Sequence, residues 1–233
     1  MLVHKFDPFH MPGTAAYPVA VIDVCRAFTT AAYALSQGAE KVILVRELTD
    51  AFRVKSKYGS ARIIGEDRGY PVEGFDYWNS PVQIKDIDFS GVTLIQRTTA
   101  GTRAMLLCQG APMLLAASFV VAEATVRYMK MSQPAEVGLV SSGWSLGQDG
   151  PAEEDAACAN YLGSRLMGRS ADVAALFLES RKCLARWQLY GEELLADLRL
   201  DVELCLELDR FDFAMPAMIE DGALVLRKVH PPA

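Results

Sequence analysis

The chain has 233 residues and a formal net charge of −6, and 51% of its residues are hydrophobic against 22% charged. This composition predicts a globular protein with a substantial core, in one large domain or two small ones. Without a basic block, an acidic chain is not expected to bind nucleic acid. No apolar run could span a bilayer, and the N-terminus lacks the apolar stretch of a signal peptide. We therefore expect no membrane association and a cytoplasmic location.

The cysteines and histidines limit the metal sites that can be expected. The cysteines are odd in number, widely spaced and free of any C-x-x-C pair: Cys25, Cys108, Cys158, Cys183 and Cys205. This spacing indicates reduced thiols rather than a disulfide framework or a structural zinc site. The histidines lie near the chain ends, at positions 4, 10 and 230. Any metal is therefore expected to be a hard cation with oxygen ligands.

The first third of the chain alternates between strand and helix patterns. An almost continuous β-branched run at 19–24 predicts a strand covered on both faces. An alanine-rich helical pattern follows at 26–37, and Gly38 supplies a stop. A buried strand at 41–45, a polar helix at 49–57 and a short strand at 61–65 continue the alternation. This order favours a largely parallel sheet with helices on its faces.

The middle of the chain continues the same pattern after a long loop. Residues 65–81 are rich in Gly, Pro, Asp and Asn, and loops of this length are often functional. Strands are expected at 91–96 and 112–117. Between them, the turn 97–102 leads into a helix over 103–108.

The last part is expected to be mainly helical. A helix over 118–129 and a strand over 136–142 precede a second glycine-rich loop at 143–155. Residues 153 to about 198 read as helical, and 223–229 is a candidate edge strand.

Polar clusters fall where the predicted strands end, which is where parallel sheets bind ligands. They are Asp23 with Arg26, the 65–81 loop, the 97–102 turn, and the acidic group Glu153, Glu154 and Asp155. Each cluster alone is equally compatible with helix capping, a strand-end ion pair or solvated charge. Their recurrence at one edge of the sheet favours a shared binding site.

The residue types in these clusters suit a phosphorylated anion and a divalent cation. Planar guanidinium donors are available from Arg26, Arg68, Arg97 and Arg103. Hard oxygen ligands are available from Asp23, Glu66, Glu154 and Asp155. The G-x-x-x-x-G-K-[ST] and G-x-G-x-x-G nucleotide motifs are absent. Cys25 is expected to be a packed residue, although its neighbours leave a nucleophilic role open.

Four ordered stretches, "IDVCRAFTTA", "GEDRGYPVEGFDYWNSP", "RTTAGTRAM" and "EEDAACANYL", resemble the 2-phosphosulfolactate phosphatase (ComB-like) family. The late "DRFDFAMP" fits too, so the resemblance spans nearly the whole chain. It implies a single domain over 1–233 with a three-layer α/β/α fold and a largely parallel or mixed central sheet. It also implies Mg²⁺-dependent hydrolysis of 2-phospho-3-sulfolactate, a step toward coenzyme M.

The resemblance also assigns candidate site residues. Positions that match the family motifs are Asp23, Arg26, Glu66, Asn79, Ser80, Thr98, Thr99, Gly101, Thr102, Glu154 and Asp155. Mg²⁺ would be held by Asp23 with one or more of Glu66, Glu154 and Asp155, and it would polarise the phosphoryl group. Arg26, with Arg68 or Arg97, would neutralise the charge that grows on the phosphoryl oxygens. Asn79, Ser80 and the threonine turn would hold the substrate. Either water or Asp23 would attack.

Some positions depart from the family pattern: Asp67, Trp78, Ala100 and Asn160. We expect Trp78 at the rim of the site to exclude some ligands, and Ala100 lacks the amide that the family's asparagine offers there. These departures predict poor handling of 2-phosphosulfolactate and preference for another small 2-phospho acid. The alternative is a non-catalytic protein that binds an anionic metabolite. A symmetric homodimer is the expected assembly.

Overall fold

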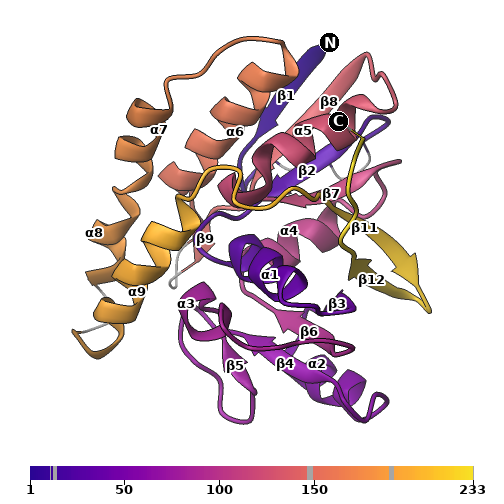
Figure 1. The fold of residues 1–233 in the computed structure, drawn as a ribbon, viewed down its shortest axis with the longest axis vertical. Coiled ribbons are helices and arrows are strands. Elements are labelled where there is room, and N and C mark those ends of the chain that lie inside the picture. Colours follow the sequence, from indigo (N-terminus) through magenta and orange to yellow (C-terminus); the bar gives the residue numbers. More distant parts are fainter. Residues whose placement is uncertain (11, 13–14, 146–148, 189–191, 233) are drawn as a thin grey trace.

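The computed structural model describes residues 1–10, 12, 15–145, 149–188 and 192–232. In this part of the chain, one ten-stranded mixed sheet carries helices on both faces (Figure 1). The predicted three-layer α/β/α fold is therefore confirmed. The middle of the second glycine-rich loop, residues 146–148, lies outside the described residues. The assignment of residues 1–233 to a single domain stays a prediction.

One half of the sheet is parallel. Its strands in spatial order are β1 (Leu2–Phe6), β8 (Glu136–Ser141), β2 (Val19–Ile22) and β7 (Leu114–Ala117). After β2, helix α1 (Ala27–Ser36) ends just before Gly38, whose φ of +95° is the left-handed conformation that stops a helix. The strand, helix and glycine stop predicted here are confirmed. β1 was not predicted.

The other half of the sheet is also parallel. Its strands in spatial order are β3 (Lys41–Leu44), β6 (Thr93–Arg97), β4 (Arg62–Gly65) and β5 (Tyr77–Trp78). The short strand β5 lies inside the predicted 65–81 loop. The helices that follow these strands in the chain are α2 (Leu48–Lys55), α3 (Pro81–Ile84) and α4 (Gly101–Leu107).

A C-terminal antiparallel hairpin joins the two halves. Strands β11 (Met215–Glu220) and β12 (Ala223–Leu226) lie between β7 and β3. Asp221 and Gly222, with φ of 49° and 77°, form its two-residue turn. The prediction of 223–229 as an edge strand was wrong, because β12 is paired on both sides, to β11 and to β3.

Side chains alternate between the two faces of the sheet. In β2, Val19 and Val21 pack with α1, α3 and α4 on one face. Ala20 and Ile22 point to the opposite core, which is covered by the C-terminal helices and by α5 (Ala122–Lys130), the helix that follows the short turn η1 (Phe119–Val121). On that same face of the other half, α2 covers Ile43, Ile63 and Ile95. Burial of both faces explains why the strands read as continuous apolar runs.

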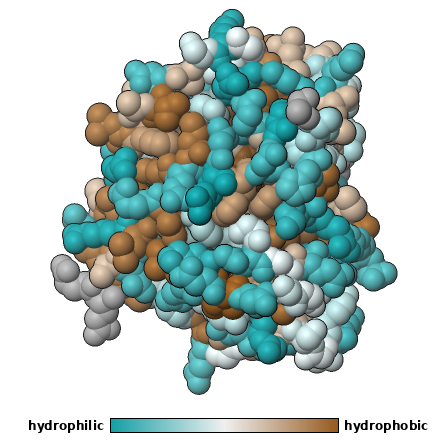
Figure 2. All heavy atoms as spheres, viewed as in Figure 1, coloured by the Kyte–Doolittle hydropathy of each residue, from teal (hydrophilic) through white to brown (hydrophobic). Residues whose placement is uncertain are grey.

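The region predicted to be helical from 153 onward contains four helices among its described residues, 153–188 and 192 onward. They are α6 (Glu153–Leu166), α7 (Val173–Ser180), α8 (Cys183–Trp187) and α9 (Glu192–Cys205). Before them, β9 (Trp144–Ser145) and β10 (Asp149–Gly150) form a small separate ribbon. Figure 2 shows apolar side chains gathered over α7, where Leu178 is 73% exposed. No helix in the described part of the chain combines the length and apolar character needed to cross a membrane.

Candidate active site

A small polar cavity opens where strands from both halves of the sheet end. Four strands lie between β2 and β6 in the sheet, yet the segments that follow β2 and β6 meet at this cavity. It measures about 70 Å³. Its walls are formed by Asp23, Cys25, Arg26, Glu66, Gly69, Asn79, Thr98, Thr99, Ala100, Gly143, Trp187 and Leu198. Six predicted site residues therefore share one cavity: Asp23, Arg26, Glu66, Asn79, Thr98 and Thr99.

Asp23 is fixed at the entrance to α1. Its Oδ1 accepts a hydrogen bond from the backbone N–H of Ala27 at 2.9 Å, and its Oδ2 accepts one from Ser142 Oγ at 3.1 Å. A Cβ placed on Gly101 would lie only 2.6 Å from Asp23 Oδ2. The glycine at the start of α4 is therefore required by the close approach of this carboxylate, whereas its predicted role in substrate binding stays a prediction.

Ser142 links Asp23 to Asp155. Its Oγ lies 3.1 Å from an oxygen of each carboxyl group, but one hydroxyl proton can be donated to only one of them. The contact with the other carboxyl group is favourable only if that group is protonated and donates a hydrogen bond to the serine oxygen. Burial raises the pKa of Asp23 to about 6, and the charge of Glu66 adds to the rise. Burial and the charge of Asp23 also raise the pKa of Asp155. The two acids therefore titrate as a coupled pair.

Arg26 pairs with Asp201 of α9, and not with Asp23. Its Nη1 donates to Asp201 Oδ2 at 2.8 Å, and its guanidinium lies 4.1 Å from the ring centre of Trp78 and 5.5 Å from that of Trp187. Trp78 is 6% exposed, and its indole N–H donates to the carbonyl of Gly69. The prediction of Trp78 at the rim was wrong, because its ring is buried against this cation.

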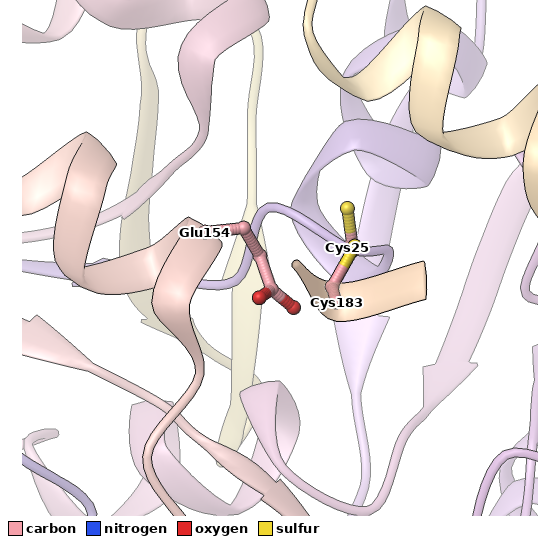
Figure 3. A group of neighbouring side chains, drawn as sticks. All are labelled: Cys25, Glu154 and Cys183. Carbon is pink, nitrogen blue, oxygen red and sulfur yellow. The ribbon is translucent and has the colours of Figure 1, made fainter. Parts of the chain in front are cut away.

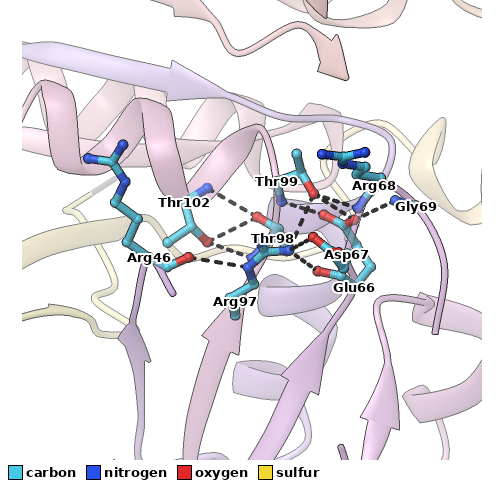
Figure 4. A network of polar contacts seen from close by, with 9 residues as sticks. All are labelled: Arg46, Glu66, Asp67, Arg68, Gly69, Arg97, Thr98, Thr99 and Thr102. Carbon is cyan, nitrogen blue, oxygen red and sulfur yellow. Dashed lines mark hydrogen bonds and ion pairs between the residues drawn. The ribbon is translucent and has the colours of Figure 1, made fainter. Parts of the chain in front are cut away.

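Glu66 organises the loop that follows β4, as Figure 4 shows. Its Oε1 accepts from the backbone N–H of Thr99 at 2.5 Å, and its Oε2 accepts from the N–H of Gly69 at 2.5 Å and from Thr99 Oγ1 at 2.9 Å. Glu66 is only 6% exposed. One buried carboxylate thus joins the 65–81 loop to the 97–102 turn.

The threonine turn closes on itself. Thr98 and Thr102 each donate a backbone N–H to the other's Oγ1, both at 3.1 Å. Thr98 lines the cavity, whereas Thr102 is fully buried and holds the turn. The capping role that was open for these threonines therefore applies to Thr98, whose Oγ1 accepts the N–H of Thr102 in the first turn of α4.

Asn79 and Ser80, adjacent in the chain, differ in position. Asn79 lines the cavity, is 4% exposed, and its Oδ1 has no hydrogen-bond partner among the described residues. A buried, unsatisfied amide oxygen in a cavity wall indicates a missing donor or cation. Ser80 is fully buried instead, and its Oγ donates to Asp201 Oδ1 at 2.7 Å.

The other predicted arginines line an adjoining pocket of about 290 Å³. It shares Thr98 and Thr99 with the first cavity. Its remaining walls are Arg46, Glu47, Asp67, Arg68, Arg97 and Arg103. The Nη1 of Arg97 donates to Asp67 Oδ1 and to the carbonyl of Glu66, both at 2.7 Å (Figure 4). Four arginines against two acids make this pocket positive in an acidic chain.

Glu154 and Asp155 do not line the cavity. Asp155 accepts from the backbone N–H groups of Val24 and Gly143, at 2.8 and 3.1 Å, so it ties the segments after β2 and β8 together. Glu154 lies beside Cys25 and Cys183 in Figure 3. Both acids are 2% exposed, and burial raises the pKa of each.

Three residues of α8 and α9 that shape the site were not predicted from the sequence. Asp201 holds Arg26, while Trp187 and Leu198 supply the cavity wall that comes from α8 and α9. They lie in helices far along the chain, in a region without motif or glycine-rich turn. The amphipathic pattern of α9 offers one weak signal, because Asp201 is fully buried on an otherwise apolar face.

The cavity residues fit a Mg²⁺ ion. Mg²⁺ prefers oxygen ligands and binds proteins through one or two carboxylates plus substrate and water. Asp23 and Glu66 supply two buried carboxylates, and Asn79 supplies an unsatisfied amide oxygen. Arg26, the cation in this wall, is already paired with Asp201. A cation between the carboxylates would offset their mutual repulsion.

Comparison with known proteins agrees with the family resemblance. The model of the family described as 2-phosphosulpholactate phosphatase matches residues 8–217. The chain is 34% identical over 240 residues to a probable 2-phosphosulfolactate phosphatase of Synechococcus sp. (strain CC9605), covering 93% of this chain and 97% of the relative. It is 35% identical over 220 residues to the protein with the same name from Synechocystis sp. (strain PCC 6803), covering 88% and 90%. A Bacillus subtilis (strain 168) protein of that name is 34% identical over 164 residues, 70% of this chain and 69% of that relative.

The fold and the site thus describe an α/β protein with an acidic and arginine-bearing cavity at the carboxyl ends of its strands. The chain belongs to the 2-phosphosulfolactate phosphatase family, a family of phosphoric monoester hydrolases.

Proposed function

We propose that the protein is a Mg²⁺-dependent phosphatase that releases phosphate from a small 2-phospho acid. The compound against which its substrates are compared is 2-phosphosulfolactate. One observation carries the proposal: Asp23, Glu66 and the unsatisfied Asn79 Oδ1 face one buried cavity beside a guanidinium. Family membership supports the same reaction class. The cytoplasmic location, the role in coenzyme M biosynthesis and the homodimer stay predictions.

Asp23 and Glu66 would hold Mg²⁺, with Asn79 Oδ1 as a further oxygen ligand. The bound ion would supply Lewis-acid polarisation of the phosphoryl group. Glu154 and Asp155, which were expected among the ligands, would act differently. Asp155 would hold the Asp23 loop in place through Val24 and Ser142. Asp23 remains the first candidate for a carboxylate nucleophile, and water attack is the other route.

Arg26 would bind the phosphoryl oxygens. Its salt bridge to Asp201 and its stacking on Trp78 fix the plane of the guanidinium before substrate arrives. A pre-oriented, planar donor costs little reorganisation when negative charge grows on the oxygens in the transition state. Thr98 and Thr99 would complete the wall of the cavity, where Thr99 is bonded to Glu66.

The adjoining arginine pocket would receive the remaining acidic groups of the substrate. It shares Thr98 and Thr99 with the cavity, so one small molecule can reach both. Ala100, which stands where the family has asparagine, lies in the first cavity and offers no side-chain donor there. Because this donor is missing, we propose that the protein prefers a small 2-phospho acid other than 2-phosphosulfolactate.

Phosphate release provides the test. Purified protein is incubated with 2-phosphosulfolactate, phospholactate and phosphoglycolate in the presence of Mg²⁺ or EDTA. We expect release that requires Mg²⁺ and differs among the three compounds. Undiminished turnover in EDTA would remove the Mg²⁺ proposal. Binding of the same compounds without any release would support the non-catalytic alternative.

A further inference from the structure

Two cysteines and one glutamate gather beside the active-site cavity. Cys25 Sγ, Cys183 Sγ and a carboxylate oxygen of Glu154 all lie within 4.8 Å of one another. Figure 3 shows that they come from three elements: the turn before α1, the first turn of α6 and the start of α8. Cys183 is fully buried and Glu154 is 2% exposed, whereas Cys25 lines the cavity.

The environment of Cys25 is rich in sulfur. The thiols of Cys183 and Cys205 lie close enough to Cys25 to raise its pKa together with burial, and all three cysteines are free of disulfides. Cysteine spacing does not reveal this cluster, because positions 25 and 183 are brought together only by the packing of α8 against the α1 entrance. The expected reduced state of these thiols is confirmed, whereas their proximity was not predicted.

The donor set differs in kind from the proposed Mg²⁺ ligands. Thiolates are soft ligands that select cations such as Zn²⁺, whereas Mg²⁺ is bound through oxygen. With metal–ligand distances of about 2.0 to 2.3 Å, the donors of a tetrahedral zinc site lie roughly 3.4 to 3.8 Å apart. Shifts of about 1 Å or less would bring the present atoms to that spacing. Three protein ligands leave one position open, as in zinc sites that exchange a ligand.

We propose that Cys25, Cys183 and Glu154 form a binding site for one thiophilic divalent cation of the Zn²⁺ class, separate from Asp23 and Glu66. Each thiol gives its proton to solvent as it binds. Because Cys25 lies between Asp23 and Arg26, the cation ties the loop that carries both residues to α6 and α8. The site does not depend on the proposed phosphatase activity.

Cobalt provides a direct readout, since Co²⁺ bound to thiolates gives a near-ultraviolet charge-transfer absorption. Full-length protein, kept reduced with a non-thiol reductant, is titrated with Co²⁺ and then with Zn²⁺ or excess Mg²⁺. We expect the absorption to saturate at one Co²⁺ per chain, to be removed by Zn²⁺ and to survive Mg²⁺. Loss of a ligand in Cys25→Ala or Cys183→Ala should weaken Co²⁺ binding by about tenfold or more.

Two further variants make the test specific. Glu154→Gln should weaken binding but keep the sulfur-derived absorption. Cys108→Ala, which removes a buried thiol in the other core, should behave as the parent protein. Circular dichroism confirms folding, and Cys25→Ala, which alters a cavity wall, remains informative if Cys183→Ala does not fold. Absence of the absorption in the folded parent protein, its persistence in Cys25→Ala, or its removal by Mg²⁺ would overturn the proposal.

Discussion

Replacing Asp23 by asparagine should separate the stability of the protein from its activity. In Asp23→Asn, the amide oxygen can still accept from the N–H of Ala27, and the amide N–H can donate to Ser142 Oγ. Ser142 can then donate its single proton to Asp155. The variant therefore satisfies every contact that the carboxylate makes, without a buried charge.

The size of the effect follows from the pKa of Asp23, which burial raises from 3.8 to about 6. A raised pKa means that the acid favours the native state at low pH, and that this contribution is lost as the pH rises through about 6. Roughly two pKa units correspond to about 3 kcal/mol. At about pH 8 without metal, Asp23→Asn should be more stable than the parent by up to this amount, a Tm rise of roughly 6 to 12 °C. At about pH 4 most of the difference should be lost.

Urea or thermal unfolding in EDTA at both pH values measures the stability, and a phosphate-release assay measures kcat. Since Asp23 is a proposed metal ligand or nucleophile, kcat should fall by about a hundredfold or more, close to 3 kcal/mol of barrier. Mg²⁺ should stabilise the parent protein and have little effect on the variant. Asp201→Asn is the matched control: it leaves Arg26 buried without its ionic partner and should destabilise by about 3 to 5 kcal/mol. A less stable Asp23→Asn at high pH, or one with normal kcat, would refute the reasoning.

Three other substitutions test residues in and beside the cavity. Arg26→Lys loses the planar donor that stacks on Trp78, so kcat/KM should fall by about a hundredfold; near-normal kinetics would place phosphate binding at the arginine pocket. Gly101→Ala puts a Cβ 2.6 Å from Asp23 Oδ2 and should lower kcat while the circular dichroism spectrum stays unchanged; unchanged kcat would show that the carboxylate position is not critical. Ala100→Asn restores an amide donor and should raise kcat/KM for 2-phosphosulfolactate over phosphoglycolate by about ten- to a hundredfold; an unchanged ratio would make this departure neutral.

The parallel parts of the sheet could be predicted because their strands are short, β-branched and buried on both faces. The hairpin was missed for a physical reason. Pro216 lies in β11, and proline is rare in a strand paired on both sides because it has no N–H to donate. The Asp-Gly pair at 221–222 is a hairpin signal that could have located the turn.

The residues at strand ends were predictable, whereas their partners were not. Topology alone brings Asp23, Glu66 and Thr98 to one edge, since parallel strands end there. The partner of Arg26 is 175 positions away in α9, and no local pattern connects them. Asp155 was predicted as a metal ligand from its motif, but its bonds to Val24 and Gly143 are visible only in three dimensions.

The position of the C-terminal hairpin has a consequence for how the protein is made. Both parallel halves of the sheet are complete by residue 141, but β7 and β3 stay open edges until residues 215–226 fill the gap between them. During synthesis, before residues 215–226 are added, the chain therefore exposes two strand edges, β7 and β3, and each edge can pair with another chain. The last strands to be synthesised, β11 and β12, therefore complete the sheet. A chain that stops before Met215 should aggregate rather than fold into a shorter active enzyme.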